Sequence, residues 1–465
     1  MKLTRAAERR YVKEHLRAVR HITLDPKGPG VIRVHMIPPS SVWDRSVPYL
    51  LILNGSAILP VGISWAILLN NFIIYTEPMH GKPIPEKEWD SIVEKAVADT
   101  VKIYPSMKEH TIRRELTKML ETLSAAARGK PLPGRLRAIS FAEYAGYMTA
   151  PHRMDLMISA MEKDGHWNCN QKCLHCYAAG QCGSSMPELS TAEWKQVIDA
   201  CRKANIPQLT FTGGEPTLRG DLVELVAHAE WFVTRLNTNG QLLTPGLCRE
   251  LYDASLDSVQ VTLYSSDRDV HNTLVGAEGF DRTVTGIRNA VAAGLNVSVN
   301  TPLCSLNRNY TATLAFICSL GVKYVTCSGL IPSGGALTEQ SKATALTDGE
   351  MDSLLTEAVA YCKEHETEIS FTSPGWLTPK RLKQIGLTEI PACGACLSNM
   401  AVRPDGEVIP CQSWLSGKGL GNILKTPFRK IWKSAECVRI RRVSAKTYYY
   451  CQLRTPGENG QGGDK

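Results

Sequence analysis

The stretch that decides the fold is MDLMISAMEKDGHWNCNQKCLHCYAAG, residues 154–180. It begins as an apolar, strand-like run and continues into a loop that places Cys169, Cys173 and Cys176 in a CxxxCxxC pattern. Three neighbouring thiolates suit an iron-sulfur cluster, which is normally held by four cysteines, so one iron is left without a protein ligand. An open coordination position separates a catalytic metal site from a structural one. The alternative is a zinc knuckle, for which three nearby residues offer a fourth ligand: His166, His175 and Cys182.

The residues that follow, up to about Pro374, alternate between strand-like and helix-like segments. Short β-branched runs are separated by amphipathic helical windows such as FDRTVTGIRNAVAAGL and DGEMDSLLTEAVAYCKE. The runs are QLTFT at 208–212, SVQVTLY at 258–264, NVSVNTPL at 296–303 and KYVTCSGLI at 323–331. Such alternation predicts an α/β fold with a parallel sheet and right-handed crossovers, curved or closed as a barrel.

A second motif lies about forty residues after the cysteines. The run QLTFT ends in Gly213-Gly214-Glu215-Pro216. CxxxCxxC with His175 before its last cysteine, followed by a strand that runs into this Gly-Gly-Glu-Pro segment, resembles the radical S-adenosylmethionine (SAM) superfamily. The resemblance implies a partial (β/α)6 barrel related to the TIM barrel, with the active site at the carboxyl ends of the strands.

The resemblance also implies a cofactor pair and a chemistry. In the family, a 4Fe-4S cluster leaves one iron open to chelate the amino and carboxylate groups of SAM. Gly213 and Gly214 would let backbone groups approach the methionine amino group, which only residues without side chains permit. One electron then splits the sulfonium and yields a 5'-deoxyadenosyl radical that abstracts a substrate hydrogen, while the protein supplies orientation.

Further residues match the family less tightly. Asn237-Thr238-Asn239-Gly240 closes the next strand, and the resemblance implies that Asn239 and Thr262 lie beside the cofactor. Asn300 is a candidate for its ribose or adenine side, and capping a strand is an equal alternative. An arginine that relatives place after the fourth strand is missing from HNTLVG at 271–276, so the contact to the methionine carboxylate stays unassigned.

The C-terminal zone repeats the metal pattern. Cys393 and Cys396 are followed by Cys411, with nine residues between Cys396 and Gly406 and four between Gly406 and Cys411. This spacing resembles the auxiliary-cluster extension called SPASM, or its shorter twitch form, and implies one auxiliary 4Fe-4S cluster. Its fourth position is Cys451, Cys437 or substrate, and Arg454 stands where a partner of Cys451 is expected. A structural zinc ion is the alternative.

Composition places the protein in a reducing compartment. The sequence has 15 cysteines, and its first residues lack the apolar core of a secretory signal. Clustered thiols in a cytoplasmic protein more often bind metals than form disulfides. The uncharged stretch 47–75 is interrupted by Asn54, Gly55, Pro60 and further polar residues, so we expect a strand pair and a helix there, and no membrane span. Six other cysteines are expected in the core: Cys201, Cys248, Cys304, Cys318, Cys327 and Cys362.

Length predicts about three domains in 465 residues. We expect an α+β domain at 1–150, the radical SAM barrel at 151–375 and the SPASM or twitch extension at 376–465. The formal net charge of +8 is concentrated in two basic runs, 2–20 and 425–446. They are interpreted as solvated helix faces, and nucleic acid is not an expected partner.

The expected function is that of a radical SAM peptide maturase. YLLILNGSAILP at 49–60, followed by helices, is similar to leader-peptide recognition domains, in which a precursor adds a strand to a sheet edge. We therefore expect a ribosomally made peptide substrate with a leader, joined by thioether or carbon-carbon links, and an electron donor such as flavodoxin or ferredoxin. The alternatives are an enzyme of tetrapyrrole or molybdopterin-type cofactor synthesis, a sulfatase maturase, and a non-enzymatic metal- or RNA-binding protein.

Overall fold

The computed structural model describes most of the chain as two compact units. The described residues are 2–24, 32–39, 41, 47–55, 57–79, 84–127, 130, 138–139, 141–159, 167–181, 188–387, 389–415, 417–446 and 449–453. Unit 1 comprises residues 1–150 with 231–233, and unit 2 comprises 151–230 with 234–465. His166, Cys182, Arg454 and most of the glycine- and proline-containing stretch 129–135 lie outside the described residues. The predicted domain bounds stay a prediction.

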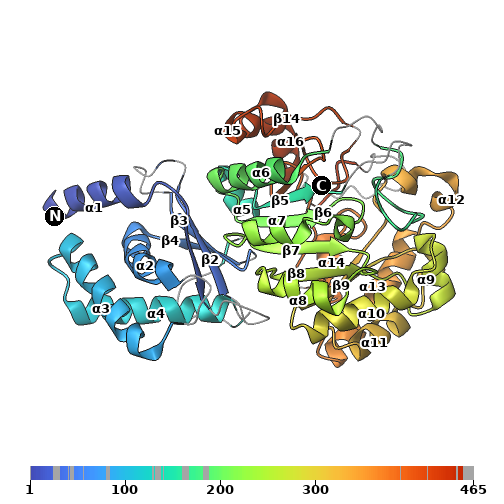
Figure 1. Cartoon of the computed structure of the whole chain (residues 1–465), viewed down its shortest axis with the longest axis horizontal. Coiled ribbons are helices and arrows are strands. Elements are labelled where there is room, and N and C mark those ends of the chain that lie inside the picture. The colour runs from blue at the N-terminus through green and yellow to red at the C-terminus, as the bar shows by residue number, and fades with distance from the viewer. Residues whose placement is uncertain are drawn as a thin grey trace. The chain divides into compact units, whose positions relative to one another are not determined.

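Unit 1 is built on a four-stranded antiparallel sheet in the order β1-β2-β3-β4 (Figure 1). Its strands are β1 (Arg20–Leu24), β2 (Ile32–Ile37), β3 (Tyr49–Leu53) and β4 (Ala57–Val61). Asn54 and Gly55 have φ of 45° and 73°, the left-handed values of a tight hairpin turn between β3 and β4. The uncharged stretch therefore forms the expected strand pair.

Four helices of unit 1 share one apolar core with this sheet. They are α1 (Lys2–His15), α2 (Ile63–Thr76), α3 (Glu86–Ile103) and α4 (Glu109–Ala127), and the single turn α5 (Phe141–Tyr144) follows them in the chain. The core joins Leu51 of β3 to Phe72 of α2, Ala96 of α3 and Leu116 of α4. α2 is apolar on nearly every side and largely buried, which is the pattern of a helix in the centre of a core. None of the described helices is long and apolar enough to cross a lipid bilayer.

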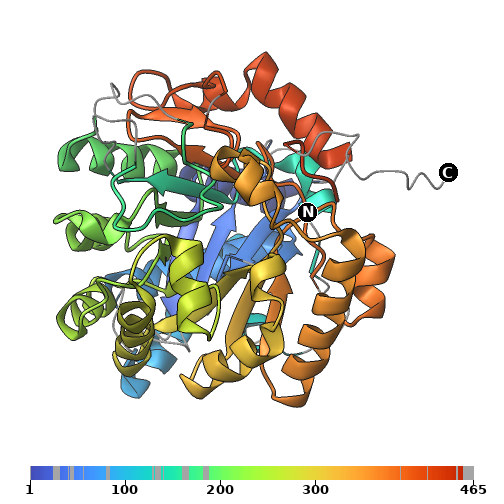
Figure 2. The same cartoon turned by 90° about the vertical axis from the view of Figure 1, so that its right-hand side faces the viewer.

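Unit 2 contains seven strands that follow one another in chain order across one sheet, β5 to β11 (Figure 2). They are β5 (Arg153–Met157), β6 (Gln208–Thr212), β7 (Val233–Thr238), β8 (Ser258–Thr262), β9 (Asn296–Pro302), β10 (Tyr324–Ser328) and β11 (Glu368–Phe371). The pairs β5/β6, β7/β8, β8/β9, β9/β10 and β10/β11 are parallel. The predicted α/β fold with a parallel, open barrel-like sheet is confirmed, with β11 as a strand beyond the six expected.

Helices follow the strands, and most of them line the outer face of the curved sheet, whereas α9 and α12 contact the cysteine loop (Figure 2). They are α6 (Thr191–Lys203), α7 (Leu222–His228), α8 (Pro245–Asp253), α9 (Arg268–Val275), α10 (Phe280–Ala292), α11 (Tyr310–Ser319), α12 (Glu339–Lys342), α13 (Asp348–Glu364) and α14 (Pro379–Gln384). In β8, Val259 and Val261 are buried, whereas Gln260 and Thr262, which alternate with them, are half-buried. Because successive side chains of a strand point to opposite faces, the polar residues share one face of β8.

The C-terminal segment extends the same sheet. β12 (Asn399–Val402) pairs in parallel with β5, and β13 (Glu407–Ile409) and β14 (Gly421–Asn422) follow in antiparallel order. The helices α15 (Phe428–Trp432) and α16 (Ala435–Lys446) come after them. Gly406, with φ of 83°, forms the turn between β12 and β13, a position that the SPASM spacing assigns to glycine.

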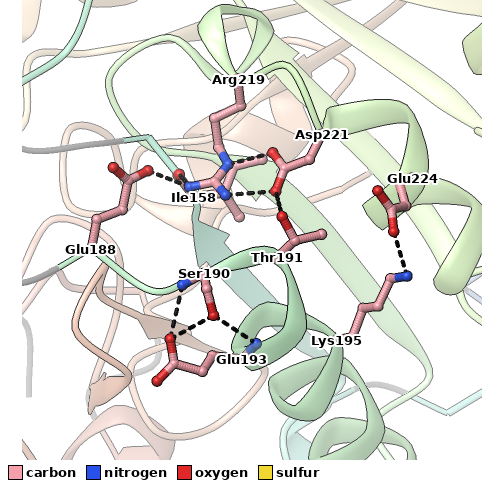
Figure 3. A network of polar contacts seen from close by, with 9 residues as sticks. All are labelled: Ile158, Glu188, Ser190, Thr191, Glu193, Lys195, Arg219, Asp221 and Glu224. Carbon is pink, nitrogen blue, oxygen red and sulfur yellow. Dashed lines mark hydrogen bonds and ion pairs between the residues drawn. The ribbon is translucent and has the colours of Figure 1, made fainter.

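The largely buried Arg219 connects Ile158, the residue just after β5, to Glu188 and Asp221 on two neighbouring segments (Figure 3). Arg219 donates to the carbonyl of Ile158 at 2.9 Å and to both carboxylate oxygens of Asp221 at 2.8 and 2.7 Å, and it also pairs with Glu188. Thr191, at the start of α6, donates to Asp221 at 2.6 Å. The side chain of Arg219 is only 11% exposed, so this charge is compensated inside the protein.

We predict that Arg219→Ala lowers the free energy of unfolding by about 2 kcal/mol, because hydrogen bonds to a charged group are lost and the carbonyl of Ile158 is left unpaired. Arg268→Ala is the matched control, since Arg268 and Asp281 form an ion pair of which both side chains are more than half exposed. Urea unfolding of the two variants measures the difference. Equal losses in both variants would contradict a structural role for the Arg219 network.

Candidate functional site

The three cysteines of the first motif lie in the loop that leaves β5 and precedes α6. Cys169, Cys173 and Cys176 are half-buried thiols in this loop, and electrostatic effects among them show that they are neighbours. Burial raises the pKa of Cys169 to about 11 and also raises the pKa of Cys173 and Cys176. Thiols in such surroundings need a cation to become thiolates, and a bound metal supplies it.

Backbone contacts hold this loop against two segments far away in the sequence. The N–H groups of Lys172 and Leu174 donate to Val275 and Leu274, at the end of α9, both at 2.9 Å. The N–H of Gly335 donates to the carbonyl of Cys176 at 2.8 Å. Backbone hydrogen bonds therefore position the cysteine loop without any contribution from the cysteine side chains. A metal-binding loop needs such positioning before the metal binds.

The Gly-Gly-Glu segment after β6 lies directly on the beginning of the loop. The N–H of Glu215 donates to the carbonyl of Asn168 at 3.0 Å, and a Cβ atom on Gly214 would stand 2.4 Å from that oxygen. Gly213 has φ of 136°, and a Cβ there would meet Ser159 at 2.6 Å. Both glycines are required by close packing against Ser159 and Asn168. The cradle that their backbone is expected to form for the methionine end of SAM stays a prediction.

The side chain of Glu215 is occupied within the protein. Oε1 accepts from the N–H of Thr217 at 3.0 Å and from the hydroxyls of Thr217 and Thr238 at 2.5 and 2.6 Å, and Oε2 accepts from the N–H of Asn239 at 2.7 Å. The carboxylate joins the ends of β6 and β7. The backbone of Glu215 is bonded as well, because its N–H donates to Asn168 and its carbonyl accepts from the N–H of Leu218 at 3.2 Å. A contact of Glu215 or Pro216 with a cofactor stays a prediction.

The other predicted cofactor residues lie at the carboxyl ends of strands. Asn239 Nδ2 donates to Asn170 Oδ1 at 2.6 Å and lies 4.0 Å from the thiol of Cys169. Thr262 and Asn300 are register partners at the ends of β8 and β9. The Asn300 amide oxygen accepts from Thr326 at 2.8 Å, so it is held toward the polar face of the sheet. The contacts of these residues with a cofactor stay a prediction.

Two amides beside the loop were not predicted from the sequence. The Nε2 atoms of Gln171 and Gln241 are buried and have no hydrogen-bond partner among the described residues. Gln241 Oε1 accepts from Asn170, and Asn170 in turn accepts from Asn239. Orphaned buried donors of this kind point to an acceptor that occupies the site. The sequence offered one signal for Gln171, which is its position between Cys169 and Cys173 in the motif.

Of the three proposed ligands of the zinc alternative, the structure describes His175, whose Nδ1 is buried and has no hydrogen-bond partner among the described residues. His175 Nε2 hydrogen-bonds the Thr344 hydroxyl at 2.8 Å, and burial lowers the pKa of this histidine to about 4. His166 and Cys182 lie outside the described residues. Within the part of the chain that the structure describes, no three or more His, Cys, Asp and Glu side chains are gathered closely enough for a single metal ion. The thiolates of a cluster ligate separate irons, so this finding does not test them.

The C-terminal cysteines come together from three segments of unit 2. Cys393 and Cys396 precede β12, Cys411 follows β13, and electrostatic effects place Cys411 near Cys393, Cys396 and Cys451. A hydrogen bond to Cys396 lowers the pKa of Cys437, and burial raises the pKa of Cys411 to about 12. The donor set is thiols alone, which fits an iron-sulfur cluster. The motif does not decide whether Cys451, Cys437 or substrate supplies the fourth ligand of this cluster.

We predict that Gly214→Ala prevents stable assembly of the first site, because its Cβ would overlap the carbonyl of Asn168. Gly220→Ala is the matched control in the same segment, since a Cβ there has no neighbour within 4 Å. Iron content after anaerobic reconstitution measures the effect, and we expect a loss of iron in the first variant alone. Full iron retention by Gly214→Ala would show that the loop does not need this contact.

Comparisons with known proteins agree with the two cysteine sites. Residues 168–317 match the radical SAM superfamily, and residues 393–453 match the iron-sulfur cluster-binding domain SPASM. An AdoMet-dependent heme synthase of Oleidesulfovibrio alaskensis is 28% identical over 308 residues, which are 63% of this chain and 75% of that protein. The mycofactocin maturase MftC of Mycobacterium tuberculosis is 29% identical over 280 residues, or 58% of this chain and 69% of that protein.

The fold has a counterpart among solved structures. SuiB of Streptococcus suis, in a structure with its precursor peptide SuiA, superposes with a TM-score of 0.56 at 14% identity, covering 85% of this chain and 88% of that one. Since unit 2 makes up only about two thirds of the chain, this likeness in fold extends into the first 150 residues. The predicted cofactor classes, SAM and iron-sulfur clusters, are confirmed by the two domains. The chain therefore contains a radical SAM domain at residues 168–317 and a SPASM domain at residues 393–453.

Proposed function

We propose that this enzyme modifies a ribosomally made precursor peptide, forming a thioether, a carbon-carbon link or a related change in a residue. The observation that carries the proposal is the antiparallel sheet of unit 1, in which β1 pairs with β2 alone among the described strands. An edge strand offers unpaired backbone groups to an extended peptide, which can add as a further strand.

Of the two edges of this sheet, β1 suits a peptide better than β4. In β4, Pro60 has no N–H to donate, and the carbonyl of Ile58 already accepts from the N–H of Ile139 at 2.9 Å. Basic residues precede β1 in the sequence, and Arg9, Arg10 and Lys13 are exposed on α1. A positive approach to an open edge favours a leader peptide with acidic residues.

Unit 2 offers room for such a substrate near both cysteine sites. A cavity of about 510 Å³ is lined by three segments that follow the cysteine loops or a barrel strand: residues 179–181, residues 332–335 with 337–338, and residues 413–414 with Gly417. Leu453 completes its lining shortly after Cys451. Gly334 and Gly335 belong to the lining and pack closely against the carbonyls of Tyr177 and Leu174, so this wall of the cavity is fixed to the cysteine loop.

The chain's own residues would perform holding and positioning in this reaction. Cys169, Cys173 and Cys176 would hold the cluster, and the backbone of Gly213 and Gly214 would receive the methionine end of SAM. When bound, these groups supply a 5'-deoxyadenosyl radical that removes a hydrogen atom from the substrate. The electron comes from a flavodoxin- or ferredoxin-class donor, and the described cysteines, all free thiols, support the reducing cytoplasm as the compartment.

A second candidate is the modification of a tetrapyrrole, favoured by the likeness to heme synthases. The match to the heme synthase covers 63% of this chain. An enzyme for a tetrapyrrole has no evident use for the sheet of unit 1, whereas a peptide maturase has one. The two candidates therefore differ in whether residues 1–150 are needed for turnover.

We predict that the reconstituted enzyme, given dithionite and SAM under anaerobic conditions, forms 5'-deoxyadenosine. The variant Cys169→Ala, Cys173→Ala, Cys176→Ala is expected to lose at least a hundredfold of this activity, because no iron is held beside the cradle. Cys201→Ala, a buried cysteine on α6, is the control. Absence of cleavage in a wild-type protein with an intact cluster would remove the radical mechanism.

We predict that a peptide from a short open reading frame beside the gene stimulates SAM cleavage, whereas iron coproporphyrin does not. The full-length variant Arg9→Glu, Arg10→Glu, Lys13→Glu should bind the peptide at least tenfold more weakly and should lose that difference at high salt, because the attraction is screened. Fluorescence anisotropy measures the binding. Lys363→Glu on α13, in unit 2, is the control. Stimulation by the porphyrin, with no peptide binding, would favour the second candidate.

A further inference from the structure

The sequence left the fourth ligand of the auxiliary cluster open among Cys451, Cys437 and substrate, and α16 bears on that choice. Cys437, Ile440 and Ser444 are the buried residues of this helix. Their spacing of three and four residues places them on one face. Cys437 is fully buried, and its side chain hydrogen-bonds that of Cys396. The helix thus presents a thiol to a cysteine of the SPASM spacing.

Polar contacts fix the same face of α16 to the segment that carries Cys393 and Cys396. The Ser444 hydroxyl donates to the carbonyl of Ala395 at 2.6 Å and lies 3.8 Å from the Cys393 thiol. Gln452 Nε2 donates to Ser444 at 2.7 Å and lies 3.9 Å from the same thiol. The position of Cys437 beside Cys396 is therefore held by contacts of α16 and Gln452 with the residues just before Cys396.

The backbone of Cys396 is itself held in an uncommon conformation. Its φ is +52°, in the left-handed region that side chains other than those of Asn and Asp rarely adopt. The N–H of Cys396 donates to the carbonyl of Pro410 at 3.1 Å, which ties this turn to the residue before Cys411. Such conformations cost about 1 kcal/mol or more and persist where surrounding contacts impose them, often at functional sites. Here the turn brings the Cys396 thiol toward Cys437.

A fixed cation lies beside Cys437. Arg441, one helical turn further, places Nη1 3.5 Å from the Cys437 sulfur. Its guanidinium is stacked over Trp432, with Cζ 3.8 Å from the ring centroid, and donates to the Trp432 carbonyl at 3.3 and 3.2 Å. Stacking and two hydrogen bonds fix the guanidinium in one position, so its positive charge stays next to the Cys437 sulfur.

We propose that Cys437 is the fourth protein ligand of the auxiliary cluster, together with Cys393, Cys396 and Cys411, and that Arg441 raises the reduction potential of that cluster. A cluster with four thiolates leaves no iron open, so it does not bind a substrate atom directly. A fixed positive charge stabilises the reduced state, which carries one more negative charge than the oxidised state. The proposal depends on the SPASM cluster and not on the peptide substrate.

The ligand test uses a full-length background in which Cys169, Cys173 and Cys176 are alanine, so that only the auxiliary cluster is observed. Cys437→Ala is expected to lose most of the iron and the EPR signal of the dithionite-reduced protein. Cys451→Ala, the matched variant of the rival ligand, should retain both. Cys362→Ala, at a buried cysteine of α13, controls for the loss of a buried thiol. Thermal unfolding of all variants verifies that they fold.

Retention of full iron and an unchanged EPR spectrum in Cys437→Ala overturns the assignment, and so does loss of the cluster from Cys451→Ala. Because the background has no first cluster, these outcomes are independent of whether the enzyme acts on a peptide. If Cys437→Ala fails to fold, the spectrum of Cys451→Ala alone decides, since a fourth ligand at Cys451 predicts a changed spectrum there and Cys437 predicts none.

The charge test measures the midpoint potential of the auxiliary cluster in the same background. Arg441→Gln is expected to shift the potential to lower values with no loss of iron, because the reduced state loses its cation. Arg441→Lys keeps the charge and should restore most of the wild-type potential. A purely structural role for Arg441 would instead change iron content or thermal stability and leave the potential where it was, and that result would overturn the assigned role.

Discussion

The site depends on one close backbone contact, that between Gly214 and the carbonyl of Asn168. It joins the end of β6 to the beginning of the cysteine loop at a separation that no side chain permits. The N–H of Glu215 hydrogen-bonds the same carbonyl, and its carboxylate extends the connection to the end of β7 through Thr238 and Asn239. Three consecutive barrel segments are thus joined beside the thiols before any cofactor binds.

The sequence was most informative where one residue type is required by local chemistry. The CxxxCxxC spacing and the alternation of strands with helices predicted the cysteine loop and the parallel sheet. The two glycines indicated a close backbone approach, and the structure shows such an approach to Ser159 and Asn168. The windows 280–295 and 348–364 contain α10 and α13 because their apolar residues recur at helical spacing. In unit 1, the hairpin at Asn54 and Gly55 was predictable from the turn residues between two apolar runs.

Long-range hydrogen bonds could not be predicted from local sequence patterns. The carboxylate of Glu215 bonds Thr238 and Asn239 at the end of the next strand, and no local pattern encodes those partners. Cys437 had no ligand spacing relative to Cys411, because its approach to Cys396 depends on how α16 packs. The orphaned amides of Gln171 and Gln241 show the same limit, since burial without a partner is a property of the folded chain.

The sheet relates the two cysteine sites to each other within unit 2. β5 leads to the Cys169 loop at its carboxyl end, while Cys396 precedes β12, which runs parallel to β5. The sites therefore lie toward opposite ends of one strand pair, and five residues of strand span about 16 Å. Burial raises the pKa of Tyr177, and the charges of Cys176 and Cys411 raise it further. A single aromatic side chain is thus close to a thiol of each site, and the pairing of β12 with β5 sets the distance between the two sites.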